Sequence, residues 1–170
     1  EKTSGNGVAI PGHVIQVKQT VVGDVFSTAI GPNFAEMTDF RTNITPNSTN
    51  SKILVRGELF VGQHYYQVRG RILRDSTPIA LGTIRGSRTP VTWCVINYSG
   101  GQSNSQYEFS SVSFSFLDSP STTNEITYSL DMGGYSTSYN VYLNRGHIDT
   151  DASTHHGQPF SSITLLEIAQ

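Results

Sequence analysis

The chain has 170 residues, the length of one domain, with a formal net charge of −2 at pH 7 and a pI near 6.2. Only 14% of the residues are charged, and the abundant Ser, Thr, Asn and Gly favour turns and pleated surfaces over helices. The sequence has no basic field of the kind that binds nucleic acid and no run of 18 apolar residues that could insert into a membrane, so we expect neither partner.

Residues 1–12 are rich in Gly, Ser and Asn and end in Pro11-Gly12. This composition predicts an N-terminal arm or linker, followed by a single domain over residues 13–170. An ordinary frayed terminus has the same composition, so the sequence leaves both interpretations open.

Apolar and polar residues alternate along most of the chain with the period of a strand. The predicted strands cover 13–22, 26–30, 34–40, 51–61, 65–74, 91–98, 107–117, 125–132, 139–143 and 161–170, with a loop over 42–51 and a short apolar piece at 79–81. The strands 51–61 and 65–74 flank a turn near Gly62 and are expected to form a hairpin. In 125–132 the polar residues Glu125, Thr127, Ser129 and Asp131 are expected to point outward.

This pattern predicts an all-β fold, a jelly-roll β-sandwich of about eight to ten antiparallel strands. Cys94 is the only cysteine, so no disulfide forms within the chain. Because it stands beside Trp93 in an apolar run, we expect Cys94 to be buried as a small hydrophobic residue.

The last predicted strand is apolar on both faces, with Ile163 and Leu165 on one and Leu166 and Ile168 on the other. A strand of this kind needs cover on both sides. These four residues are therefore candidates for the interface of a homotrimer. The alternative is a central strand of a monomeric sandwich, covered on both sides by its own chain.

The densest polar cluster is His147-Ile148-Asp149-Thr150-Asp151, followed by His155-His156. Its spacing matches neither a zinc site nor an EF-hand, so we expect no metal and no cofactor. No nucleophile elbow or phosphate-binding Gly-rich loop is present, so we expect no catalytic residue and no enzymatic activity. The candidate ligand contacts are loop residues of polar or aromatic type: Tyr98, Tyr135, Asp149, Asp151, His155 and His156.

Several phrases, in order, resemble a family of virion structural proteins from tailed bacteriophages, many of them cyanophages. The resemblance covers about residues 8 to 169. Among the phrases that carry it are Ile10-Pro11-Gly12-His13-Val14-Ile15-Gln16, Arg74-Asp75-Ser76-Thr77-Pro78-Ile79, Tyr142-Leu143-Asn144-Arg145-Gly146 and Ser162-Ile163-Thr164-Leu165-Leu166-Glu167-Ile168. The resemblance implies a knob like those of the tumour necrosis factor and C1q group, usually a homotrimer, and it brings no catalytic motif.

The resulting hypothesis is a non-enzymatic phage virion protein, a trimeric knob at a tail fibre tip that attaches to the host surface. Its expected partners are further copies of itself, other phage virion proteins, and host cell-surface polysaccharide or protein, and its expected location is the virion. The alternative is a capsid decoration protein, either a cement protein or a head fibre, or a structural component of the tail or baseplate. A polysaccharide-degrading spike is a third, weaker hypothesis from the enzyme class.

Overall fold

The computed structural model describes residues 10–63, 66–96, 108–151, 153–154 and 157–170. In this part of the chain the structure contains eleven strands and no helix, which confirms the all-β expectation. The strands are β1 (Val14–Val22), β2 (Phe26–Thr28), β3 (Ala35–Ile44), β4 (Lys52–Gln63), β5 (Gln67–Arg74), β6 (Thr77–Ile79), β7 (Trp93–Ile96), β8 (Ser110–Asp118), β9 (Ile126–Gly133), β10 (Val141–Leu143) and β11 (Ser161–Ile168). No described segment forms a helix that could cross a membrane.

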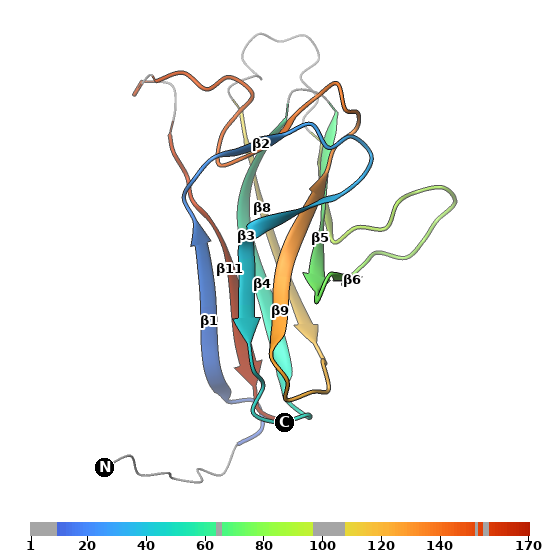
Figure 1. Cartoon of the computed structure of the whole chain (residues 1–170), viewed down its shortest axis with the longest axis vertical. Coiled ribbons are helices and arrows are strands. Elements are labelled where there is room, and N and C mark those ends of the chain that lie inside the picture. Colours follow the sequence, from blue (N-terminus) through green and yellow to red (C-terminus); the bar gives the residue numbers. More distant parts are fainter. Residues whose placement is uncertain (1–9, 64–65, 97–107, 152, 155–156) are drawn as a thin grey trace.

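The strands form two antiparallel sheets that pack face to face as a β-sandwich (Figure 1). In sheet A, β4 pairs with β11 along residues 52–58 and with β8 along residues 53–61, so these partners lie on its two edges. Strand β1 pairs with β11, while β10 continues along β4 beyond β11 and pairs with β2. Sheet B has the order β3-β9-β5, with β6 and β7 both paired to β5.

The long-range pairing is nested along the chain. Strand β1 pairs with β11, β3 with β9, β4 with β8, and β5 with β7. The strands β3, β4 and β5 therefore lie alternately in sheets B, A and B, and the second half of the chain returns along the first-half partners in reverse order. This arrangement brings residues far apart in sequence side by side.

One hydrophobic core fills the space between the sheets. Its fully buried side chains come from both layers, including Phe40, Tyr128, Leu130, Ile163 and Leu165. The regular alternation seen in the sequence places these side chains inward, since successive residues of a strand point to opposite faces.

Two predictions about individual strands are wrong. Strands β4 and β5 do not form a hairpin, because they belong to different sheets and the chain crosses the sandwich between them. The predicted loop over 42–51 begins too early: β3 runs to Ile44, where Thr42 and Ile44 pair with Tyr128 and Ile126 and are buried.

One prediction about side-chain direction is wrong, and another is correct in direction although the side chains are buried. Cys94 is exposed rather than buried, because Trp93 takes the inward position and the next residue must point outward. Ser129 and Asp131 do point away from the core, yet both are buried on the outer face of sheet B. Neighbouring polar side chains cover them, since Asp131 pairs with Arg71 and Ser129 donates a hydrogen bond to Glu36.

The two ends of the described chain lie together at one end of the sandwich (Figure 1). The Gly12 amide donates to the Ala169 carbonyl at 2.8 Å, and the Ala169 amide donates to the His13 carbonyl at 2.9 Å. The predicted arm over residues 1–12 stays a prediction, because residues 1–9 lie outside the described part.

Candidate functional site

The loops between β1 and β3, between β9 and β10, and between β10 and β11 gather at the end opposite to the chain ends (Figure 1). We call this region the loop end. It presents the described residues that the sequence singles out as ligand contacts, namely Tyr135, Asp149 and Asp151. Tyr98, His155 and His156 lie outside the described residues.

Tyr135 forms an exposed aromatic pair with Tyr66. The ring centroids lie 4.2 Å apart and the ring planes are inclined by 35°. Tyr135 comes from the β9–β10 loop and is 51% exposed, whereas Tyr66 precedes β5 and is 39% exposed. Sequence reasoning missed Tyr66 because it stands in a segment predicted to be strand. The two rings form an aromatic surface with polar hydroxyl groups, a combination suited to contacts that are partly apolar and partly wet.

The loop that carries Tyr135 is fixed by contacts with the β2–β3 connection. The Arg69 guanidinium donates to the carbonyls of Pro32 and Gly134, at 3.0 and 3.1 Å. The Gly134 amide also donates to the Gly31 carbonyl at 2.8 Å. Because these bonds hold the backbone beside Tyr135, its ring is presented from a supported loop.

The β10–β11 connection begins with a buried anchor. Asn144 has φ 58°, and its side-chain amide donates to the carbonyls of Val22 and Asp24 at 2.8 and 2.9 Å. Its amide oxygen accepts from the Ser161 hydroxyl at 2.6 Å. Asn tolerates this left-handed conformation better than most residues, and the three bonds tie the loop to β1 and β11.

Beyond this anchor, Arg145 organises the exposed part of the connection. It forms an ion pair with Asp149 at 3.1 Å and donates to the His147 carbonyl at 2.9 Å. Its guanidinium lies 4.9 Å from the centroid of the Tyr142 ring, and the Tyr142 hydroxyl lies 2.7 Å from His147 Nδ1. Burial raises the pKa of the Tyr142 hydroxyl, so it remains protonated at neutral pH.

A groove of ≈470 Å³ opens along this connection. We call it the loop-end groove. Its polar lining residues are Asn144, Arg145, Asp149, Thr150, Asp151, Ser153 and Gln158, and Phe109 adds an aromatic side. The structure therefore brings Asp149 and Asp151 together in one concave surface. Among the described residues, no group of three or more His, Cys, Asp or Glu side chains is placed to hold a metal ion.

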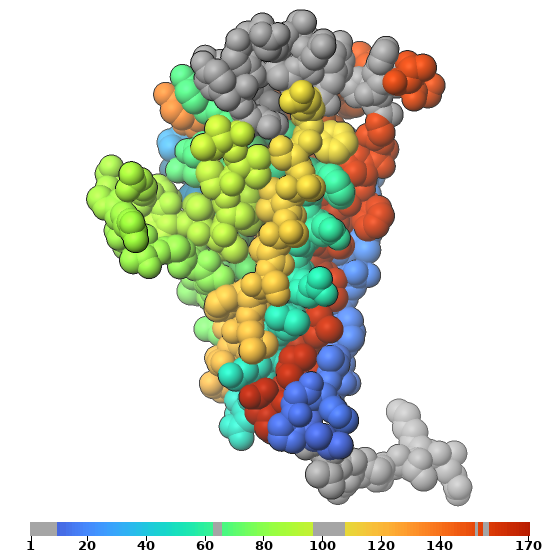
Figure 2. Space-filling model, turned by 180° about the vertical axis from the view of Figure 1, so that it is seen from behind, coloured from blue at the N-terminus to red at the C-terminus, as the bar shows by residue number. Residues whose placement is uncertain are grey.

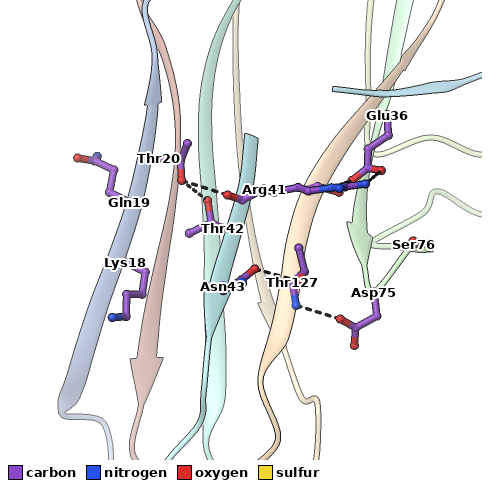
Figure 3. Close-up of a pocket in the computed structure, with 11 residues that line it drawn as sticks. Lys18, Gln19, Thr20, Glu36, Arg41, Thr42, Asn43, Asp75, Ser76 and Thr127 are labelled. Atoms are coloured by element: carbon purple, nitrogen blue, oxygen red, sulfur yellow. Dashed lines mark hydrogen bonds and ion pairs between the residues drawn. The ribbon is translucent and has the colours of Figure 1, made fainter. Parts of the chain in front are cut away.

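A larger groove, of ≈770 Å³, lies on the side of the sandwich between β1 and β3 (Figure 3). Three of its charged lining residues, Glu36, Arg41 and Asp75, already have partners within the chain. Arg41 donates to both carboxylate oxygens of Glu36, at 2.9 and 2.7 Å, and Asp75 accepts from the Thr127 amide at 2.9 Å. The Arg41 hydrogen bonds lower the pKa of Glu36 to about 2, with help from Ser129. These contacts join strands, and they give a structural explanation for the groove.

The four predicted interface residues divide into two pairs. Ile163 and Leu165 are fully buried in the core of their own chain, so their assignment to a subunit interface is wrong. Leu166 and Ile168 lie on the outer face of sheet A and are partly exposed. Strand β11 is central in its sheet, and the described chain covers only its inner face.

Comparison with known proteins identifies no family. No family model matches the chain, and no curated protein matches it. Among solved structures, the chain is similar to the VP2 subviral particle of infectious bursal disease virus, with 12% sequence identity and a TM-score of 0.38. The match covers 91% of this chain and 38% of that chain, so this chain spans little more than a third of its length. A TM-score this low does not establish a shared fold.

Proposed function

We propose that this chain is a non-enzymatic structural protein of a bacteriophage virion, a trimeric knob at the tip of a tail fibre that attaches to the host surface. The observation that carries the proposal is that the two ends of the sandwich differ. Both described chain ends lie at one end, and the Tyr66–Tyr135 pair and the loop-end groove lie at the other. A module attached at its base would present this second end to a ligand.

The chemistry of the loop end suits a polysaccharide. Exposed aromatic faces stack on the apolar faces of sugar rings, and Tyr66 and Tyr135 supply two such faces. Carboxylate, amide, hydroxyl and guanidinium groups bond sugar hydroxyls, and all four occur in the loop-end groove. Aromatic anchors surrounded by adaptable polar side chains are also the composition of antibody binding loops.

The nested strand pairing supports the jelly-roll interpretation of the sandwich. The outer face of sheet A supports assembly, because Leu166 and Ile168 continue an apolar surface that the described chain leaves open. Threefold symmetry comes from the resemblance to phage knobs, and the open face is where we place the other copies.

Localisation on intact virions tests the proposal. Gold-labelled antibodies against the purified chain are expected to mark the tips of the tail fibres in electron micrographs. Labelling of the head lattice or of the baseplate would contradict the tail-tip assignment and support the decoration or baseplate alternative. Release of reducing ends from host polysaccharide by the purified protein would contradict the non-enzymatic assignment.

A further inference from the structure

Residues 80–92, between β6 and β7, form a protrusion that we call the finger. The Gly82 amide donates to the Val91 carbonyl at 3.2 Å and closes its base, while the Arg88 amide donates to the Arg85 carbonyl at 3.3 Å across its tip. Gly86 has φ 60° in this tip turn. The finger starts at the edge of sheet B and stands clear of the sandwich in two views (Figures 1 and 2).

The finger carries apolar and basic side chains into solvent. Ile84, near its tip, is 71% exposed, and Leu81 is also exposed. Arg85 and Arg88 are exposed and have no ion pair with the described residues, and residues 80–92 include no Asp or Glu. The described part of the chain provides no apolar surface that covers Ile84 and no carboxylate that pairs with Arg85 or Arg88.

The outer face of sheet A offers an apolar surface. Val17, Leu166, Leu54 and Leu117 are direct neighbours on β1, β11, β4 and β8 and form one row across the sheet. They share a face because directly paired residues point to the same side, and Leu165, next to Leu166, points into the core. Figure 2 shows these strands side by side, with the finger projecting beyond their edge.

A hollow of ≈570 Å³ adjoins this row. Small hydroxyl side chains make the surface concave there, and the lining includes Ser113, Ser115, Ser162, Thr164 and Leu166. Arg56 and Glu58 are exposed at the hollow, and neither forms an ion pair with a described residue. Glu58 thus has no cation partner among the described residues, and it lies within a hydroxyl-lined hollow that borders an apolar row.

We infer that the finger of one copy docks on the outer face of sheet A of the next copy. Ile84 then covers part of the apolar row, and an arginine of the finger tip pairs with Glu58. This inference rests on the self-association in the proposed function and adds how the copies meet. The contact joins two different surfaces, so it is heterologous. A heterologous contact forms a ring when the rotation between copies closes, as it does in the proposed trimer, and an open filament when it does not.

Charge and shape favour this occupant over the same face of a second copy. Pairing two sheet A faces would leave every finger, including Ile84, exposed to solvent. Docking the finger covers Ile84 and Leu166 together and gives Glu58 a cation. Arg56 lies on the same face as Glu58, and in the docked arrangement the hydroxyl and carbonyl groups of Thr83, Ser87 and Thr89 of the finger would be its hydrogen-bond acceptors.

Cysteine cross-linking tests the contact and keeps a small apolar side chain at position 84. In a Cys94→Ser background, one chain carries Ile84→Cys and a second, differently tagged chain carries Thr164→Cys. After co-expression and treatment with a short bifunctional maleimide, we expect the major product to join one chain of each kind. A matched control replaces Ile84→Cys by Val25→Cys, which is also exposed but lies on the β1–β2 connection, and should give no such product.

Three other outcomes would overturn the inference. Products that join only two Thr164→Cys chains would indicate face-to-face pairing. An associated protein without the mixed product would place the interface elsewhere while leaving self-association intact. A protein with the mass of a single chain would remove self-association itself.

A second measurement uses Ile84→Asp, which places a charge in the apolar contact. We expect the dissociation constant of the assembly to rise at least about tenfold, whereas Val25→Asp should leave it unchanged. Because both side chains are exposed, neither substitution should unfold the chain. Equal melting temperatures of the two unassociated variants would verify that a rise in the dissociation constant is not caused by unfolding. An unchanged dissociation constant for Ile84→Asp would contradict the finger assignment.

Discussion

Glu167 is a fully buried carboxylate at the end of the sandwich where the chain ends meet. Burial raises its pKa, but the neighbouring Ser51 hydroxyl together with hydrogen bonds from Gln16 and Asn47 lowers it more, so the net pKa is below the ordinary value. The Asn47 amide donates to one oxygen at 2.7 Å, and the side-chain amides of Gln16 and Asn47 donate to the other at 2.7 and 2.8 Å. One side chain thus joins β11, β1 and the β3–β4 connection.

Replacing Glu167 by Gln should destabilise the fold by about 2 kcal/mol, because one buried acceptor oxygen becomes a donor that faces other donors. Urea unfolding followed by tryptophan fluorescence measures the loss. Glu108→Gln, at an exposed carboxylate, is the matched control and should leave the midpoint unchanged. Equal midpoints for the two variants would show that the Glu167 contacts contribute little.

The lowered pKa of Glu36 predicts that the stability of the fold depends on pH in the acid range. Its pKa is about 2 in the folded chain, chiefly because of the Arg41 hydrogen bonds, and near 4.5 without them. A carboxyl group whose folded pKa is depressed stabilises the fold above its unfolded pKa, and this stability is lost as the pH falls from about 4.5 toward 2. Since Arg41 is largely exposed, solvent screening reduces the effect to about 1 kcal/mol.

The Arg41→Gln variant isolates this contribution. We expect the variant to be less stable than the natural chain at pH 6, with the difference shrinking as Glu36 becomes protonated below pH 4. Thermal melting at a series of pH values measures both quantities. A difference in stability that stays constant from pH 6 to pH 2 would contradict the role of the Glu36 charge.

At the scale of elements, each sheet contains a strand glycine covered by an aromatic ring on the neighbouring strand. Gly57 of β4 pairs with Phe114 of β8, and Gly70 of β5 pairs with Trp93 of β7. A Cβ added at Gly57 would lie 2.1 Å from Phe114 Cζ, and one at Gly70 would lie 2.1 Å from Trp93 Cζ2. The rings occupy the space that a side chain would fill, which is a known means of stabilising glycine within a sheet.

Gly70→Ala should therefore destabilise the fold by about 1–3 kcal/mol, because the Trp93 ring is forced out of its position. The same urea experiment measures this loss, and a shift in the tryptophan emission reports the displaced ring. Gly23→Ala is the control, since a Cβ there meets no atom within 4 Å. Gly70→Ala with a midpoint and an emission spectrum like the natural chain would contradict the packing argument.

Strand positions follow from local alternation, and most predicted strands agree with the observed ones within a few residues. Alternation also correctly places Ile126, Tyr128, Leu130 and Met132 in the core. It does not reveal which sheet a strand joins, since a strand needs the same inward apolar face in either layer. The β4–β5 hairpin prediction fails for that reason. The burial of Glu167 was not predicted. The alternation does indicate it, because Glu167 lies two residues after Leu165 on β11 and therefore points to the same face.

At the scale of the molecule, the candidate site is assembled from loops far apart in the chain. The sequence indicates Tyr135, Asp149 and Asp151 through their polar, glycine-rich surroundings. It does not predict Tyr66 as the partner of Tyr135, because that contact depends on how two loops meet at the end of the sandwich. For the region of the finger the sequence indicates only a short apolar piece at 79–81, since the projection of the finger is a property of the fold.

The Tyr66–Tyr135 pair gives a prediction about attachment. If the proposed attachment function holds, removing one ring by Tyr135→Ser should reduce binding of the fluorescently labelled protein to the proposed host bacterium by about tenfold, because an aromatic anchor is lost. Flow cytometry measures the bound fraction. Ile10→Ser removes an exposed apolar side chain at the opposite end and should leave binding intact. Equal losses for both variants would place the contact surface elsewhere.

The mass of the protein in solution tests most directly whether the outer face of sheet A is covered by further copies. Sedimentation equilibrium of the natural chain should give three times the 18.6 kDa of one chain, and Leu166→Asp should give a single folded chain. A mass of 18.6 kDa for the natural chain across the accessible concentrations would contradict the account.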